Sequence, residues 1–178
     1  MRLKDKVAII TAAGSGTGRA GALLFSQEGA RVVIADIDPK GGAETVKMIK
    51  NSGGDAIFVQ IDAGKVKDIR RLIDTTIDSY GAINILWNHA GVPGPGVIFE
   101  EIDEEGFDML LAVNMKGGFF ATQFAVPYMK KAGGGSIIFT SSGAALKAGM
   151  YSPAYSLTKG GLVSLTFSLA AYLGPYNI

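Results

Sequence analysis

The chain has 178 residues, of which 48% are hydrophobic and 19% charged, and its formal net charge is +1. This length favours one domain with a substantial core, so residues 1–178 are expected to form a single domain. The near-neutral charge gives no electrostatic pattern for nucleic acid. With no cysteine and one histidine, thiolate and histidine-rich metal sites are excluded, and we expect no metal.

The N-terminal segment is charged, and its apolar run at residues 7–10 is too short for the core of a signal peptide. The uncharged stretch 160–178 approaches the ~20 residues that a membrane helix needs. However, it contains serine, threonine and a Gly174-Pro175 stop, which favour a buried helix of a globular protein. We therefore expect a soluble, cytoplasmic protein with no membrane partner.

Short runs of β-branched and apolar residues recur along the chain, at residues 7–10, 32–35, 56–59, 83–87 and 136–139. These runs are nearly continuous in hydrophobicity, as expected of parallel strands that are covered on both faces.

Helical patterns separate the runs. Residues 66–80 place apolar side chains three and four positions apart, and Gly81 then predicts a C-terminal stop. Asp38 and Ser152, each followed by proline, predict helix N-caps. Alternating strands and helices predict an α/β fold, with a Rossmann-like, doubly wound parallel sheet in three layers.

A long helix is expected at residues 104–131. Asp103 could cap its N-terminus, and Gly117-Gly118 and Pro127 are the expected positions of kinks.

A glycine-rich loop joins the first strand to the first helix. A G-x-G-x-x-G pattern falls on Gly16, Gly18 and Gly21, and Asp36 follows at the end of the second strand. Such a loop and helix N-terminus can bind a pyrophosphate, while the carboxylate accepts hydrogen bonds from ribose hydroxyls. Because a carboxylate repels a 2′-phosphate, NAD is favoured over NADP. The alternatives are a purely geometric role for the glycines and an N-cap role for Asp36, although Asp38 is better placed as a cap.

A second pattern lies near the C-terminus. Tyr155 and Lys159 are four residues apart on one helix and share a face. Ser141 and Ser142 follow the fifth strand, at the sheet edge where open α/β sheets bind ligands. The chain therefore brings serine, tyrosine and lysine toward one position.

Together, these residues resemble the short-chain dehydrogenases/reductases in their compact form. The resemblance covers the whole chain in the family's order: the glycine loop 11–18, the segment 88–91, Asn114, Ser142 thirteen residues before Tyr155, and Lys159.

The resemblance implies hydride transfer between a nicotinamide cofactor and a secondary alcohol or ketone. It assigns Tyr155 as the acid/base and Ser142 as the group that hydrogen-bonds the substrate oxygen. A tyrosine phenol is a poor base at neutral pH, but the adjacent Lys159 ammonium and a positive nicotinamide favour the phenolate. Lys159 would also bind the nicotinamide ribose, and Asn114 would hold a water that relays protons toward Lys159.

The resemblance also implies a set of cofactor-binding residues. They are Thr11, Gly14, Ser15, Gly16, Thr17, Gly18, Asp36, Ile37, Asp62, Ala63, Asn88, Ala90, Gly91, Tyr155 and Lys159. Asp62 would contact adenine; its alternative is a helix cap before Lys65. The alternative for Asn114 is a residue that kinks its helix.

Two residues depart from the family's pattern. Ala12 replaces a glycine of the loop, where we expect a small perturbation. His89 replaces the second asparagine of the segment 88–91; we interpret it as a residue at the sheet end that is hydrogen-bonded to backbone, with a proton relay as the alternative.

Relative to the family, the chain is expected to be C-terminally incomplete and to lack the last two strands. The fifth strand would then be an unpaired apolar edge, so we expect residues 1–178 to be poorly soluble and inactive alone, and the full chain to be active. The resemblance also implies a homodimer or homotetramer packed through the helices that carry Asn114 and Tyr155.

The sequence does not identify the substrate, because the segments 92–96 and 143–150 that would line its pocket fit many alcohols, steroids and sugars. A 3-oxoacyl-carrier-protein reductase using NADPH is an alternative within the family. Outside that activity, the alternatives are a non-catalytic dinucleotide-binding regulator and an extended-type sugar-nucleotide epimerase, which spaces its glycines differently.

Overall fold

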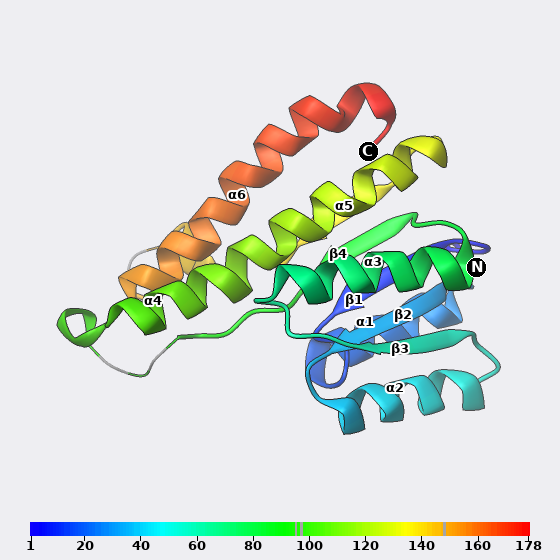
Figure 1. Cartoon of the computed structure of the whole chain (residues 1–178), viewed down its shortest axis with the longest axis horizontal. Coiled ribbons are helices and arrows are strands. Elements are labelled where there is room, and N and C mark those ends of the chain that lie inside the picture. The colour runs from blue at the N-terminus through cyan, green and yellow to red at the C-terminus, as the bar shows by residue number, and fades with distance from the viewer. Residues whose placement is uncertain (95, 97, 148) are drawn as a thin grey trace.

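Five parallel strands form one sheet in the order β3-β2-β1-β4-β5 (Figure 1). The computed structural model describes residues 1–94, 96, 98–147 and 149–178. The strands are β1 (Val7–Thr11), β2 (Arg31–Asp36), β3 (Ala56–Gln60), β4 (Ile85–Asn88) and β5 (Ser136–Phe139). The five predicted strands are thus confirmed, with β4 beginning two residues later than expected because Ile83 precedes the ladder. The strand order changes direction between β1 and β4, which is where such sheets bind ligands.

Helices cover both faces of this sheet. They are α1 (Gly16–Gln27), α2 (Pro39–Asn51), α3 (Val66–Tyr80), α4 (Glu104–Leu111), α5 (Gly117–Lys131) and α6 (Pro153–Leu173). One core cluster joins the sheet to α1 and α2, and another joins its opposite face to α3 and α5. The predicted three-layer, doubly wound fold is confirmed, and β1 is buried along its whole length, as its continuous hydrophobicity requires.

The expected helix signals act at the predicted residues. Asp38 accepts hydrogen bonds from the amides of Lys40 and Gly41 at the start of α2. Ser152 accepts from the amide of Tyr155 at the start of α6, and Gly81 ends α3 in the left-handed conformation with φ 73°.

The long helix expected at residues 104–131 is interrupted. A π-helical segment, Ala112–Lys116, separates α4 from α5, so the irregularity precedes Gly117 instead of lying at the glycine pair. Pro127 lies inside α5 without ending it. A π-turn inserts one residue into a helix and is often found at functional sites; here Asn114 is its central residue.

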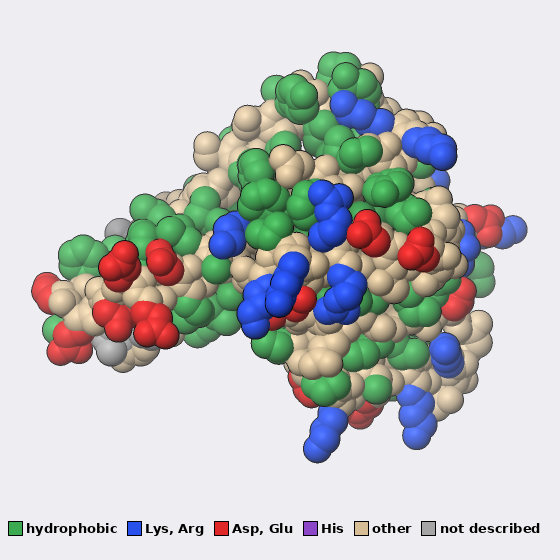
Figure 2. Space-filling view, viewed as in Figure 1, with side chains coloured by type: hydrophobic (Ala, Val, Ile, Leu, Met, Phe, Trp, Pro, Cys, Tyr) green, Lys and Arg blue, Asp and Glu red, His purple; other side chains and the backbone are tan. Residues whose placement is uncertain are grey.

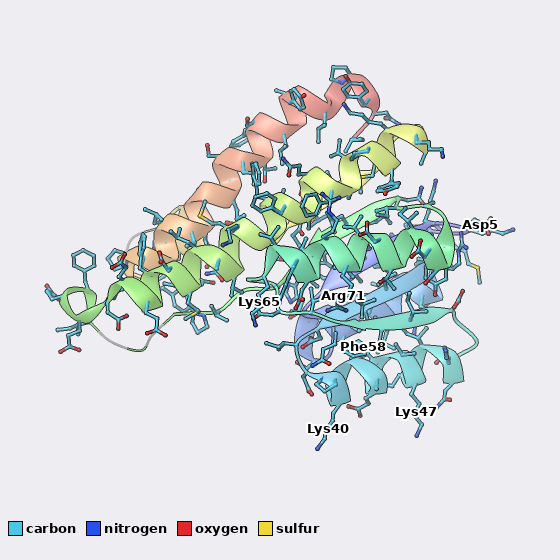
Figure 3. The ribbon with its side chains drawn as sticks, in the orientation of Figure 1. Asp5, Lys40, Lys47, Phe58, Lys65 and Arg71 are labelled. Atoms are coloured by element: carbon cyan, nitrogen blue, oxygen red, sulfur yellow. The ribbon has the colours of Figure 1, made fainter. Side chains whose placement is uncertain are left out.

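Two glycines allow α1 and α2 to approach the sheet. A Cβ on Gly21 would overlap the Trp87 ring, and one on Gly42 would overlap the Phe58 ring. Figure 3 labels Phe58 between β3 and α2. Gly21, which completes the G-x-G-x-x-G pattern, is therefore a packing glycine.

Several large apolar side chains lie exposed on the outer helices. Phe119 of α5 and Phe167 and Tyr172 of α6 are among them, and Figure 2 shows hydrophobic side chains gathered over these helices. Among the residues that the structure describes, no helix combines the length and hydrophobicity needed to cross a membrane.

Candidate active site

The loop between β1 and α1 is open toward the start of the helix. Gly16 adopts φ +51° with nothing near its hypothetical Cβ, whereas a Cβ on Gly18 would overlap the carbonyl oxygen of Ala12. Ser15 is the N-cap residue of α1, but its side chain makes no capping hydrogen bond. The first amides of α1 are therefore available to an anion such as a pyrophosphate.

Ala12 adopts a left-handed conformation, with φ 54°. This conformation suits glycine and costs an alanine roughly 1–2 kcal/mol. The substitution predicted as a small perturbation therefore leaves the turn intact but adds local backbone strain.

Asp36, the last residue of β2, reaches the glycine loop. One of its carboxylate oxygens accepts a hydrogen bond from the Gly14 amide at 2.7 Å, and the other accepts from the Asp38 amide at 2.9 Å. Asp38, and not Asp36, caps α2, so the N-cap alternative for Asp36 is wrong. Two backbone amides fix the orientation of this carboxylate beside the loop.

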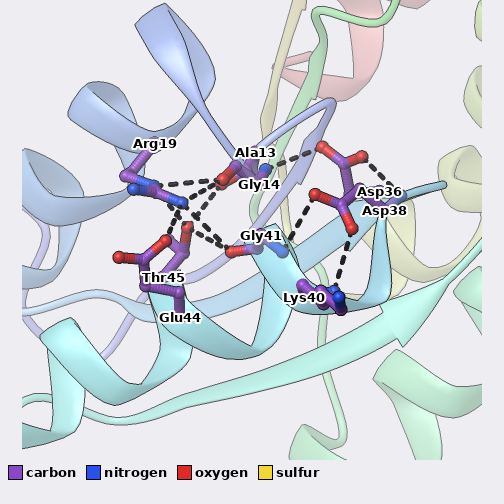
Figure 4. Close-up of polar contacts among 9 residues, drawn as sticks. All are labelled: Ala13, Gly14, Arg19, Asp36, Asp38, Lys40, Gly41, Glu44 and Thr45. Carbon is purple, nitrogen blue, oxygen red and sulfur yellow. Dashed lines mark hydrogen bonds and ion pairs between the residues drawn. The ribbon is translucent and has the colours of Figure 1, made fainter.

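Arg19 connects the glycine loop to α2 (Figure 4). Its guanidinium donates to the Gly14 carbonyl and to the Thr45 hydroxyl, and pairs with Glu44 at 2.8 Å. Thr45 is buried and its hydroxyl in turn donates to the Ala13 carbonyl. Neither Arg19 nor Thr45 is predicted from the sequence pattern, in which the position of Arg19 directly after Gly18 is the one signal for this network.

A cavity of about 160 Å³ follows the carboxyl edge of the sheet from Asp36 to Gly91. It is lined by Ala12, Ala35, Asp36, Ile37, Ile61, Asp62, Ala63, Ala90, Gly91, Val92 and Val113. The structure therefore gathers six of the predicted cofactor residues around one space: Asp36, Ile37, Asp62, Ala63, Ala90 and Gly91.

Asp62 lies in this cavity and does not cap α3. Its carboxylate accepts from the Gly64 amide at 2.9 Å and pairs with Lys65 at 3.0 Å, and Figure 3 labels Lys65 beside the sheet edge. The N-cap of α3 is Lys65, which makes no side-chain capping bond. The helix-cap alternative for Asp62 is therefore wrong.

Two other predicted cofactor residues join neighbouring strands. Thr11 of β1 is buried, and its hydroxyl accepts hydrogen bonds from the His89 and Ala90 amides, each at 2.9 Å. Asn88 is also buried, and its side-chain amide donates to the Thr122 hydroxyl at 3.4 Å. Both side chains fix the backbone of the segment 88–91, which borders the cavity.

Lys159 lies beside Gly91, which lines this cavity, and is only 3% exposed. Its ammonium donates to the Thr140 carbonyl at 2.8 Å, and a Cβ on Gly91 would lie 3.0 Å from it. Burial lowers the pKa of Lys159 below its usual 10.5. The ammonium nitrogen lies 5.7 Å from the centre of the Tyr155 ring, which confirms that these residues share a face of α6.

Asn114 is buried within the π-helical segment. Its side chain exchanges hydrogen bonds with both the amide and the carbonyl of Val92, at 2.8 and 3.0 Å, and donates to the Thr158 hydroxyl at 3.1 Å. These bonds hold the loop after β4 against α6. A cavity of about 10 Å³ borders Asn114, Asn88 and Thr11, which is room for about one water molecule.

Ser142 and Tyr155 begin two consecutive helical segments. The Ser142 hydroxyl accepts from the Ala144 amide at 3.2 Å at the start of a short 3-10 helix, Gly143–Ala145. Tyr155 stands in the first turn of α6, where its ring lies 4.7 Å from that of Tyr151. Ser141 donates to the Lys159 carbonyl at 2.9 Å and so ties the end of β5 to α6.

His89 follows β4 directly, at the predicted sheet end. Its ring nitrogen Nδ1 lies 3.0 Å from the Thr140 hydroxyl, so the expected hydrogen bond to backbone is wrong: the partner is a side chain. Burial, and secondarily the charge of Lys159, lower the pKa of His89 below 6.5. Both effects favour the neutral imidazole.

Comparison with known proteins identifies the family. The family described as short chain dehydrogenase matches residues 6–178. The chain belongs to the short-chain dehydrogenase/reductase family. It is therefore an oxidoreductase of a family that acts on small molecules and generally binds NAD or NADP.

Individual relatives agree with this assignment. An uncharacterized oxidoreductase of Thermotoga maritima is 43% identical over 178 residues, which is 100% of this chain and 70% of that protein. A 7α-hydroxysteroid dehydrogenase, solved with NADH and 7-oxo glycochenodeoxycholic acid, is 33% identical with a TM-score of 0.95, covering 99% of this chain and 69% of that one. A 3-ketoacyl-ACP reductase of Sinorhizobium meliloti is 31% identical with a TM-score of 0.93, covering 97% and 68%.

The segments expected to line the substrate pocket are described only in part. Pro95 of the segment 92–96 and Ala148 of the segment 143–150 lie outside the described residues. Within the described part of the chain, no group of three or more histidine, cysteine, aspartate or glutamate side chains is placed to hold a metal ion.

Proposed function

We propose that this short-chain dehydrogenase/reductase transfers hydride between NAD(H) and a secondary alcohol or ketone. One observation carries the proposal: the cavity that begins at Asp36 ends at Gly91, and Gly91 lies directly against Lys159 and Asn114. A carboxylate suited to a ribose thus lines one end of the cavity, and a buried ammonium suited to the reacting end of the cofactor lies beside Gly91 at the other end.

The residues present fit a dinucleotide. The open amides at the start of α1 and the space at Gly16 suit a pyrophosphate. The pyrophosphate would be surrounded by Thr11, Gly14, Ser15, Gly16, Thr17 and Gly18. The adenosine would be held by Asp36, Ile37, Asp62 and Ala63. The nicotinamide half would be held by Asn88, Ala90, Gly91, Tyr155 and Lys159.

Asp36 favours NAD over NADP. Its carboxylate is fixed by two backbone amides, so it cannot turn away from a bound ribose without breaking them. Each carboxylate oxygen keeps a second lone pair for a ribose hydroxyl, whereas a 2′-phosphate would meet a like charge.

The chain's own residues would manage the proton at the substrate oxygen. The bound nicotinamide supplies only the transfer of hydride to or from the carbon. Tyr155 would accept the hydroxyl proton in alcohol oxidation and return it in ketone reduction. Ser142 would hydrogen-bond the same oxygen as its charge changes.

Lys159 and Asn114 would support this step. Lys159 would hold the nicotinamide ribose, and its ammonium nitrogen lies 5.7 Å from the centre of the Tyr155 ring. Asn114 borders a space for about one water, which fits the holding of a water that carries protons toward Lys159.

Tyr155→Phe separates catalysis from binding. We expect NADH affinity within about twofold of wild type, and turnover of secondary alcohols lower by about a hundredfold or more, the usual contribution of a general acid or base. The measurement, made on the full-length protein, is nicotinamide absorbance with a panel of simple cyclic alcohols, hydroxysteroids and sugar alcohols. Equal turnover in both proteins would contradict the assignment of Tyr155.

A reductase acting on carrier-protein thioesters is the second candidate, because one structural relative is a 3-ketoacyl-ACP reductase. Activity on a 3-oxoacyl thioester with NADPH exceeding that with NADH would favour it. NADH binding without turnover of any substrate class, in wild type and Tyr155→Phe alike, would instead favour a dinucleotide-binding regulator.

A further inference from the structure

The only histidine of the chain lies against its only tryptophan. The centres of the His89 and Trp87 rings are 5.0 Å apart. Trp87 belongs to β4 and His89 follows this strand directly, and both side chains contact Thr140, the residue that follows β5. The histidine is also a departure from the family's pattern, so a role for it cannot be taken over from that pattern.

The hydroxyl of Thr140 is held from two sides. It accepts a hydrogen bond from Trp87 Nε1 at 2.8 Å, and an indole nitrogen can only donate. His89 Nδ1 lies 3.0 Å from the same hydroxyl oxygen. The contact with Nδ1 can run in either direction, because a hydroxyl oxygen can accept two hydrogen bonds and donate one. When the hydroxyl donates to Nδ1, His89 is the neutral tautomer with its proton on Nε2.

The backbone of the same threonine holds Lys159. The Thr140 amide donates to the Asn88 carbonyl at 3.0 Å, and its carbonyl accepts from the Lys159 ammonium at 2.8 Å. Thr140 therefore contacts the imidazole through its side chain and the ammonium through its main chain.

The surroundings of the imidazole favour its neutral form. The groups that contact it, Trp87 of β4 and Thr140 beyond β5, are uncharged. Among the described residues, Lys159 of α6 is the charged group that acts on it, and this charge, after burial, lowers the pKa of His89. Protonation would turn Nδ1 into a donor and displace the hydroxyl proton of Thr140 from its acceptor.

We propose that His89 and Thr140 are positioning residues for Lys159: the neutral imidazole fixes the Thr140 hydroxyl, and the Thr140 carbonyl fixes the ammonium. The role of Lys159 toward the cofactor rests on the function proposed above, whereas the link between the three residues does not. Protonation of His89 loosens this arrangement, and the charge of Lys159 in turn opposes that protonation, because coupling between two sites is reciprocal.

The unmodified protein tests the first hydrogen bond. With one histidine, ¹⁵N NMR of the imidazole reads its tautomer directly, and we expect the proton on Nε2 near neutral pH. With one tryptophan, Trp87 fluorescence reports the titration of the adjacent imidazole, with an expected midpoint below 6.5. A proton on Nδ1 would overturn the proposal, and this result needs no variant to fold.

Variants test whether Thr140 and Lys159 affect the titration of His89. Thr140→Val removes the hydroxyl and retains a β-branched shape, and Lys159→Met removes the charge. Each should raise the midpoint by about half a pH unit or more, a threefold change in proton affinity. Thr140→Ser should keep the wild-type midpoint. Thr76→Val is the matched control, because the hydroxyl of this buried threonine bonds only within α3.

NADH titration completes the test. Thr140→Val should weaken NADH binding about threefold to tenfold, with Thr140→Ser and Thr76→Val close to wild type. Midpoints unchanged in both Thr140→Val and Lys159→Met would overturn the positioning role. If wild type fails to bind NADH, the proposed function fails, while the tautomer and the midpoints still decide whether His89, Thr140 and Lys159 act together.

Discussion

At the scale of single residues, two side chains sit where stability and function conflict. Ala12 takes a left-handed conformation that suits glycine. Lys159 places a positive charge in a site that is only 3% exposed, where a charged group loses hydration. Both are features that a sequence selected for stability alone would avoid.

Replacing Ala12 with glycine should stabilise the protein. Relief of the left-handed strain is worth roughly 1–2 kcal/mol, and the greater freedom of glycine in the unfolded chain offsets about 0.4–1 kcal/mol of it. We expect a net gain of about 1 kcal/mol or less in the free energy of unfolding, measured with urea. Ala20→Gly, within α1, is the control and should destabilise by a similar amount; a loss of stability in Ala12→Gly would contradict the assigned conformation.

Replacing Lys159 with methionine should remove activity without unfolding the protein. The pKa of this lysine is lowered by burial, so the unfolded chain binds its proton more tightly than the folded one. Stability should therefore rise with pH from the lowered folded pKa toward the ordinary 10.5. In Lys159→Met this rise of stability with pH should be smaller than in wild type. The denaturation midpoint of the variant near neutral pH should equal or exceed that of wild type. The same rise in both proteins would show that Lys159 is not its source.

At the scale of elements, the junction of the glycine loop with α2 carries the cofactor side of the site. Arg19 donates to the Gly14 carbonyl and the Thr45 hydroxyl, and the amide of the same glycine donates to Asp36. The loop is thus held on one side by α1 and α2 and on the other by the end of β2 (Figure 4).

Arg19→Met should loosen this junction. It leaves the Gly14 carbonyl and the Thr45 hydroxyl without their donor, which costs about 1–3 kcal/mol, and we expect weaker NADH binding as well. Glu44→Gln is the matched control, because Glu44 is 60% exposed and a pair with an exposed partner contributes little. Equal losses in stability for Arg19→Met and Glu44→Gln would contradict this reading of the network.

The elements were largely predictable, and the junctions between them were not. Hydrophobic runs in the sequence predict the strands, and the strands form there. Local signals also predict the helix ends: Asp38 and Ser152 cap α2 and α6, and Gly81 ends α3. The π-helical segment 112–116 depends on contacts of Asn114 with Val92 and Thr158, which are distant along the chain. The same holds for the side-chain partner of His89, because nothing local in the sequence indicates that Thr140 will lie beside it.

At the scale of the whole molecule, the sheet and the outer helices leave apolar surface open. β5 lies at one edge of the sheet, as predicted, and Ile138 in it is exposed. Exposed apolar side chains of α5 and α6 add to this surface (Figure 2). A homo-oligomer that packs through these helices remains a prediction, and so does the poor solubility of residues 1–178 in isolation.

Phe167→Glu tests the association of α5 and α6. Phe167 is 73% exposed on α6, and a charge at the centre of an apolar interface is strongly unfavourable. We expect the full-length wild-type protein to scatter light as a dimer or tetramer and the full-length variant to scatter as a smaller species. Leu24→Glu, an exposed apolar position on α1, is the control. A wild-type monomer, or a variant with an unchanged mass, would contradict an interface at this face.

We infer that the cavity between Asp36 and Gly91, which lies beside Lys159, binds NAD(H), and a paired titration tests this most directly. Trp87, the only tryptophan, is excited while nicotinamide emission is followed with NADH and then with NADPH. We predict that the wild-type protein binds NADH much more tightly than NADPH. Asp36→Asn removes the charge but keeps the shape of the side chain, and should reduce this difference in affinity. Equal or tighter binding of NADPH by the wild-type protein, or no binding of either by folded protein, would contradict the claim.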